Sequence, residues 1–133
     1  MKLATVTVHS YEAGTLRLYF EPLAGAPATT AGLDVGPLFD ELPGLAKHRC
    51  DNGKHRSFCD EARDTELAHL FEHLLIELAA TSGAPREQLS GATNLDEAPA
   101  RYRIRISGLQ SAVQAEVCRE NAMRLLKRLE LCV

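Results

Sequence analysis

The segment HLFEHLLIEL, residues 69–78, lies at the centre of the most periodic stretch of the chain and decides the fold. Apolar residues recur at the spacing of an amphipathic helix from 65 to 82. Thr65 or Asp64 is the expected N-cap, Gly83 ends the helix and Pro85 blocks its continuation. The apolar face comprises Leu67, Leu70, Phe71, Leu74, Leu75 and Leu78. The opposite face comprises Glu66, His69, Glu72, His73, Ile76, Glu77 and Ala80.

The rest of the pattern predicts a small sheet and two further helices. Residues 2–9 and 15–21 alternate apolar and polar side chains on either side of a turn, which indicates a β-hairpin. Further along the chain we expect a helix at 35–42, a strand at 100–107, an amphipathic helix at 111–130, and loops at 22–34, 43–64 and 84–100. The order β-β-α-loop-α-β-α predicts an α+β fold in which helices pack on one face of a small, mainly antiparallel sheet.

Composition limits the function classes. With 133 residues, 45% of them hydrophobic, the chain suits one globular domain spanning 1–133. The net charge of −3 argues against broad nucleic-acid binding. No apolar run has the length of a membrane span, and the first residues lack the apolar block of a signal peptide. The expected location is cytoplasmic, where the four cysteines would be reduced thiols.

The simplest interpretation of the polar face of the central helix is an ordinary solvated surface, and two further interpretations assign it a more specific role. His69, Glu72 and His73 have the order of the inverted zinc motif HxxEH, and two histidines one turn apart can direct both imidazoles at one metal ion. The other interpretation is a hydrogen-bonded polar network without a metal, covered by another part of the chain because Ile76 and Ala80 interrupt the stripe. No cofactor is expected under this second interpretation, and zinc is the alternative.

A catalytic zinc ion needs a third protein ligand, and Glu72 would then be the general base. The inverted-motif peptidases take a third ligand from a later glutamate at a spacing that this chain is too short to provide. Another HxxEH family, the S-ribosylhomocysteine lyases, uses a downstream cysteine. Candidates here are Cys118 and Cys132, although Cys118 is expected to face the core. The loop before the helix offers His48, Cys50, His55 and Cys59.

Several stretches together resemble the N-terminal domain of cyanophycin synthetase. LPGLAKHRC at 42–50, then Gly53, Phe58 and Thr65, match that family's pattern in order. AHLFEHLLIELAATSG at 68–83 matches its helix, including His69, Glu72, His73, Glu77 and Gly83. ARYRIRIS at 100–107 and AEVCRENAMRLLKRL at 115–129 are similar to its later strand and helix. The resemblance covers most of residues 35–130.

The resemblance implies a binding role rather than synthesis. Cyanophycin synthetases polymerise aspartate and arginine with ATP-grasp and Mur-ligase-like domains, and this chain carries no GxxxxGK[ST] phosphate loop. The N-terminal domain of that family is taken as an accessory module that holds polymer. This chain departs from the pattern at Asp51, at Arg56-Ser57, at Ala79 and over GATNLDEAPA at 91–100, which favours a diverged stand-alone relative.

The leading hypothesis is a non-catalytic binding or assembly module for an Asp/Arg-type peptide or polymer, or for a partner ligase. Its site would combine His48, Cys50, His69, Glu72, His73 and Glu77. Arg101, Arg103 and Arg105 on the outer face of the last strand either bind carboxylates or protect a solvated strand. Two alternatives are a small metal-dependent hydrolase with His69, His73 and Cys50 as ligands and Glu72 as base, and a structural or homodimerising domain.

Overall fold

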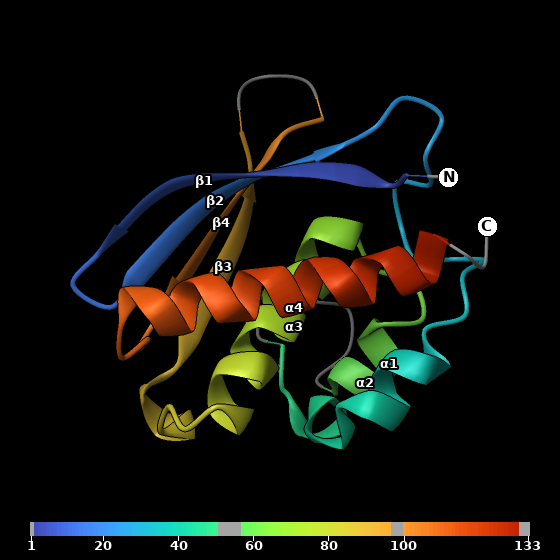
Figure 1. The fold of residues 1–133 in the computed structure, drawn as a ribbon. Helices are drawn as coiled ribbons and strands as arrows, with labels where there is room; N and C mark the ends of the chain where they lie inside the picture. The colour runs from blue at the N-terminus through green and yellow to red at the C-terminus, as the bar shows by residue number, and fades with distance from the viewer. Residues whose placement is uncertain (1, 51–56, 97–99, 131–133) are drawn as a thin grey trace.

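A single antiparallel sheet with helices on one of its faces organises the chain (Figure 1). The computed structural model describes residues 2–50, 57–96 and 100–130. The four strands lie in the order β1-β2-β4-β3, so β1 and β3 form the two edges. They are β1 (Ala4–Glu12), β2 (Thr15–Pro22), β3 (Ser90–Leu95) and β4 (Tyr102–Ser107).

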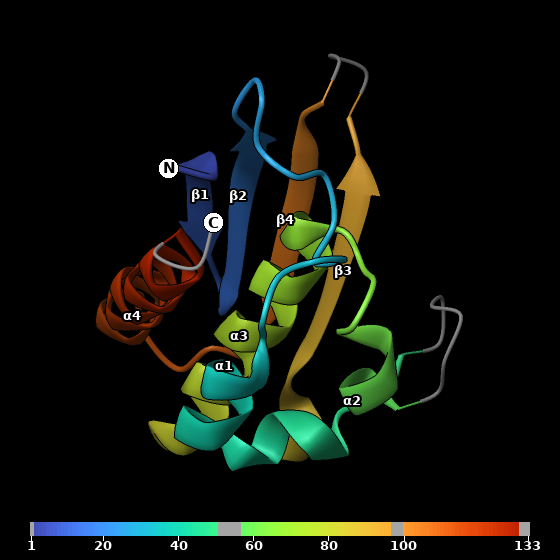
Figure 2. The ribbon, with the colours of Figure 1, turned by 90° about the vertical axis from the view of Figure 1, so that its right-hand side faces the viewer.

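The helices cover the sheet in two parts. The central helix contacts β3 and β4 as well as the C-terminal helix, which lies beside it on the β1–β2 half (Figure 2). Short helices form a second group beyond the central helix, away from the sheet. The helical elements are α1 (Gly36–Glu41), η1 (Pro43–Lys47), α2 (Phe58–Glu61), α3 (Leu67–Thr81), η2 (Arg86–Gln88) and α4 (Ala112–Glu130), where η1 and η2 are short 3₁₀ helices.

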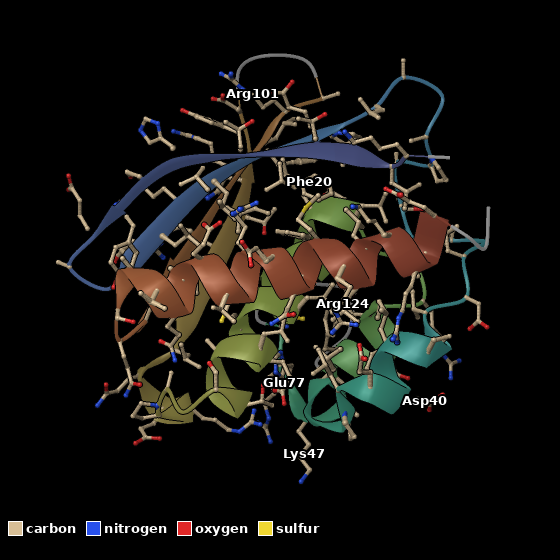
Figure 3. All side chains as sticks on the ribbon, viewed as in Figure 1. Phe20, Asp40, Lys47, Glu77, Arg101 and Arg124 are labelled. Atoms are coloured by element: carbon tan, nitrogen blue, oxygen red, sulfur yellow. The ribbon has the colours of Figure 1, made fainter. Side chains whose placement is uncertain are left out.

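Alternation along β2 and β4 builds the core. Leu16, Leu18 and Phe20 on β2 and Ile104 and Ile106 on β4 are buried beneath the helices, as the alternating pattern predicts. Figure 3 shows Phe20 on the helix side of the sheet and Arg101 on the opposite side. All six residues of the predicted apolar face of α3 are buried. The amphipathic helix expected at 111–130 is α4, and its buried residues are Ala115, Cys118, Ala122, Leu125, Leu126 and Leu129. The predicted α+β fold is confirmed.

The β1–β2 turn follows from local chemistry. Glu12 and Thr15 pair directly, leaving a two-residue turn of Ala13 and Gly14. Both turn residues have positive φ, at 49° and 82°, as a tight hairpin of this twist requires. The turn fixes the register that places Leu16, Leu18 and Phe20 toward the helices.

Two predicted loops contain regular structure. Residues 84–100, predicted as a loop, include η2 and the whole of β3. The sequence SGATNL of β3 carries one large apolar residue, so it lacks the alternation that identified the other strands. Residues 43–64, also predicted as a loop, include η1 and α2, which are too short to show helical periodicity.

The start of α3 differs from the prediction. Its N-cap is Glu66, and no side chain caps the helix there. The Thr65 hydroxyl is instead bonded to Glu61 and His69, so it is committed to the polar face of α3. Among the described residues, no helix combines the length and apolar character that a membrane crossing requires.

We expect Leu125→Ala on α4 to lower the free energy of unfolding by about 2–5 kcal/mol, the usual cost of a cavity in a packed core. Leu125 is completely buried. The control is Val113→Ala on the same helix, where the side chain is 73% exposed and the change should stay within about 0.5 kcal/mol. Urea unfolding of both variants tests the packing, and equal effects would contradict the observed orientation of α4.

Candidate metal centre

The polar face of α3 is turned inward, toward a cavity between α3, β3 and the segment after η1. Glu72, His73 and Glu77 on this face are buried, and His69 is partly buried. The cavity has a volume of about 750 Å³, and His48, Cys50, His69, Glu72 and His73 are among its lining residues. The stripe is therefore not a solvated helix face, and the sequence prediction that another part of the chain covers it matches this geometry.

Three potential metal ligands converge in this cavity. The Nε2 atoms of His69 and His73 are 3.2 Å apart. Cys50 Sγ lies 3.4 Å from His73 Nε2 and 3.8 Å from His69 Nε2. Tetrahedral zinc, with Zn–N of about 2.0–2.1 Å and Zn–S of about 2.3 Å, would separate two nitrogens by about 3.3 Å and a nitrogen and a sulfur by about 3.6 Å. The three atoms therefore have the spacing of a tetrahedral metal site.

The hydrogen bonds of His73 leave its Nε2 lone pair available. The Glu77 carboxylate only accepts hydrogen bonds, so His48 donates to it from Nε2 over 2.8 Å. His48 Nδ1 is then an acceptor, and His73 donates to it from Nδ1 over 2.9 Å. Burial, followed by the neighbouring His69 and His48, lowers the pKa of His73 to about 2, so the ring is neutral at physiological pH. The chain of bonds thus directs an unprotonated nitrogen at Cys50 and His69.

His69 is held in the same tautomer by a different route. The Thr65 hydroxyl donates to the Glu61 carboxylate over 3.2 Å. The Thr65 hydroxyl oxygen then accepts a hydrogen bond from His69 Nδ1 over 2.8 Å. His69 Nε2 therefore also carries a lone pair toward the centre, and two such lone pairs facing one another attract a cation. Three protein ligands and an open fourth position are the arrangement of catalytic zinc sites.

Glu77 anchors the His48 side of the centre. Arg86 from η2 forms two parallel hydrogen bonds to the Glu77 carboxylate, of 2.7 and 2.8 Å. Burial alone would raise the pKa of Glu77, but the bonds from Arg86 and His48 outweigh burial and hold the pKa below its ordinary value. Gly44 of η1 packs against this carboxylate so closely that an added Cβ would lie 2.1 Å from Glu77 Oε2. Glycine is required at 44 for the carboxylate to fit.

Phe58 and the residues around it hold the Cys50 segment against α3. The Phe58 amide donates to the His48 carbonyl over 2.9 Å, and Arg49 and Ser57 form an isolated antiparallel bridge. The Phe58 ring stacks on the His73 imidazole with centroids 3.8 Å apart and planes 12° apart. Phe58 thus holds His48 through a backbone hydrogen bond and His73 through ring stacking.

Glu72 is a buried carboxylate next to the potential metal ligands. Thr93 of β3 donates to Glu72 Oε1 over 2.6 Å, and Oε2 lies 3.9 Å from His73 Nε2, beside the three ligand atoms. Burial raises the pKa of Glu72 above its ordinary value, although the bond from Thr93 and the charges of His69 and Arg105 act in the opposite direction. A raised pKa brings a carboxylate closer to the range in which it exchanges protons at neutral pH.

The structure brings together six of the nine residues predicted for the site: His48, Cys50, His69, Glu72, His73 and Glu77. The three arginines lie elsewhere, at odd positions that alternate with the buried Ile104 and Ile106 and so face away from the helices. Arg101 and Arg103 pair with Asp96.

Neither Cys118 nor Cys59 extends the site. Cys118 is buried in the core, as expected, and Cys59 is exposed on α2. His55 and Cys132, both considered as ligands, lie outside the described residues.

Sequence reasoning missed the residues that support the ligands. Thr93 lies on a strand that was not predicted, and Arg86 lies in η2, within a predicted loop. Thr65 was interpreted as a cap, and Glu61 was not considered. Gly44 belongs to LPGL, and its close contact with Glu77 gives a physical reason for a glycine there.

The fold and site define a small α+β domain built around a buried His-Cys-Glu centre. A family model described as the cyanophycin synthase-like N-terminal domain matches residues 27–130. The chain therefore belongs to the cyanophycin synthase-like N-terminal domain family. A search of curated proteins found no match to the chain.

We expect the metal-free protein to lose stability as the pH falls below 6.5, because the unfolded His73 gains a proton that the folded ring accepts only near its pKa of about 2. The contribution of neutral His73 to the free energy of unfolding is fully present above pH 6.5, and about 2 kcal/mol of it is lost at pH 5. Urea unfolding in a chelator from pH 8 to 5 measures it. His73→Gln should show a shallower pH dependence, and an unchanged slope would contradict the buried neutral state of His73.

Proposed function

We propose that the chain is a zinc-dependent hydrolase of amide bonds, with Cys50, His69 and His73 as metal ligands. The observation that carries the proposal is the mutual spacing of 3.2, 3.4 and 3.8 Å among the two Nε2 atoms and Sγ. The hydrogen-bond partners of both imidazoles support it, because they leave the two Nε2 lone pairs directed at one point. Sequence reasoning favoured a non-catalytic module, and Cys50 supplies the third ligand that the hydrolase alternative needed.

The chain's own residues account for the proton transfers of such a reaction. Bound zinc supplies a polarised carbonyl and a water of lowered pKa. Glu72 accepts the proton of the attacking water and delivers it to the leaving nitrogen as the C–N bond breaks. One water is consumed, and one carboxylate and one amine are formed. Glu77 and His48 hold His73 in the ligating tautomer throughout.

The substrate that best fits the cavity is a peptide with basic side chains, such as an Asp/Arg-type peptide. Glu61, Glu66 and Glu72 line the cavity. Among the described lining residues, Arg49 is the one arginine, and there is no lysine. Carboxylates in a partly enclosed site pair well with guanidinium groups. The family is named after cyanophycin synthase. The aspartate and arginine polymer that the sequence resemblance implies supports the same choice.

We expect the purified, untagged protein to hold one zinc ion per chain and to release amines from Asp/Arg-type peptides. Cys50→Ala and His69→Ala should lose the metal and the activity together. Glu72→Gln should keep the metal and lose activity at least about 100-fold, the lower range for a general base. Cys59→Ala is the matched control, because Cys59 is exposed on α2 and should retain zinc.

Metal analysis and an amine-release assay on the four variants decide the proposal. A fully folded wild-type protein without zinc after exposure to the ion would overturn it, and so would full activity in Glu72→Gln.

A second candidate is the binding or assembly role without a metal. Every buried side-chain nitrogen and oxygen in the described part of the chain has a hydrogen-bond partner. The polar centre is therefore satisfied as a purely structural network when one proton is shared among Cys50 Sγ and the Nε2 atoms of His69 and His73. The partner would be a peptide or polymer, a ligase that supplies the synthetase domains, or a second copy of the chain. Arg103 and Arg105 are exposed on the helix-free face of the sheet, and Arg17 lies opposite Arg105.

We expect a carboxylate-rich peptide to bind this arginine face if the second role holds. Calorimetry with short poly-aspartate should give heat for the wild type, and a joint Arg103→Ala and Arg105→Ala variant should bind more weakly. Arg124→Ala on α4 is the matched control, because it removes an exposed arginine away from the sheet. Absence of heat at millimolar peptide would count against the second role and leave the zinc proposal untouched.

A further inference from the structure

β3 is an edge strand with one side of its backbone unused. It pairs with β4 alone. The Asp96 amide donates to the Arg101 carbonyl over 2.7 Å, and these two residues continue the β3–β4 register. Hydrogen-bonded and non-hydrogen-bonded pairs alternate along an antiparallel ladder. Counting back from Asp96, the residues Gly91, Thr93 and Leu95 are in non-hydrogen-bonded pairs, so their N–H and C=O groups point away from β4.

The unused side of β3 faces the cavity of the metal centre. Consecutive residues from Leu89 to Thr93 line the cavity, together with Leu95. Neighbouring strand residues point their side chains to opposite faces, so a run of consecutive lining residues means that the backbone edge itself borders the cavity. Within the described ranges, no backbone hydrogen bond from another segment reaches Gly91, Thr93 or Leu95.

This edge lies one side chain away from the ligand atoms. Thr93 donates to one oxygen of Glu72, and the other oxygen is 3.9 Å from His73 Nε2. Gly91 packs directly on Glu72, where an added Cβ would lie 3.0 Å from Oε2. A chain that runs along β3 therefore passes beside the general base and the metal ligands.

We propose that the cavity takes its substrate as an extended peptide that adds to β3 as a further strand. The main chain of the peptide is hydrogen-bonded to Gly91, Thr93 and Leu95. One of its carbonyl groups then lies beside Glu72 and the three ligand atoms. This inference rests on the proposed function for the bond that is cleaved, but the strand contact itself requires no metal.

The mode of binding predicts what the site selects. An exposed edge offers a row of main-chain donors and acceptors, and strand addition draws affinity from the main chain of the ligand. A peptide that is already folded, or one whose amides are methylated, cannot form this row. Side chains at every second position of the bound peptide face the cavity and its carboxylates, so the site selects for positive charge at alternate residues of the peptide.

The test removes one outward N–H without touching the metal centre. Proline is tolerated in an edge strand where the N–H points outward, so Leu95→Pro deletes one donor of the free edge. Leu95→Ala is the matched variant, because it removes the side chain and keeps the N–H. The probe is an acetylated and amidated hexapeptide of alternating aspartate and arginine. It is titrated into zinc-loaded Glu72→Gln protein and into the two Leu95 variants made in the same Glu72→Gln background, so that no protein in the comparison cleaves it.

We expect the dissociation constant of Leu95→Pro to exceed that of Leu95→Ala by about three- to tenfold, the contribution of one hydrogen bond. Amide exchange should slow at Gly91, Thr93 and Leu95 when the peptide is bound. Equal affinities of the two variants, exchange protection confined to other segments, or no binding at millimolar peptide would each overturn the strand addition. Zinc content and amine release are measured separately, so a failure of the hydrolase proposal would be recognised by its own readouts.

Discussion

The hydrogen bond between His48 and His73 is the contact on which the arrangement of the centre depends. It joins a short segment after η1 to the middle of α3, and it decides which nitrogen of His73 carries the proton. Its direction is set two bonds away, where Arg86 holds the Glu77 carboxylate as a pure acceptor. The tautomers of His48 and His73 are therefore both determined by the ion pair of Glu77 with Arg86.

Burial of the carboxylates of Glu72 and Glu77 makes their hydrogen bonds a requirement for folding. Glu77 is 1% exposed and Glu72 is 6% exposed, so each needs full hydrogen bonding to remain in the interior. Leaving a buried acceptor without its hydrogen-bond partner typically costs about 1–3 kcal/mol, and more when the acceptor is charged. The polar side of α3 is therefore as restrictive as its leucine side. The two faces of one helix build the hydrophobic core and the buried polar centre together.

The sequence predicted what periodicity and spacing encode, and it failed where tertiary contacts decide. The helix of α3, its two faces, the β-hairpin and the packing side of α4 all follow from repeating patterns. β3 was missed because Gly, Ala and Asn are poor strand formers and the segment lacks an alternation of apolar residues, and its pairing with β4 comes from the fold. The six clustered site residues were named from the sequence, but their supporting partners Arg86 and Thr93 are polar residues in stretches predicted as loop, which nothing local distinguishes from solvated ones.

The contact of Gly44 with Glu77 has a consequence for comparing sequences within the family. A residue with any side chain at 44 would place its Cβ where Glu77 Oε2 lies, so the two positions can change only together or with a shift of η1. A relative that replaces this glycine and keeps the glutamate must therefore shift η1 or carry its carboxylate in another orientation. A glycine at position 44 is thus a sequence marker for relatives in which Glu77, His48 and His73 have kept their geometry.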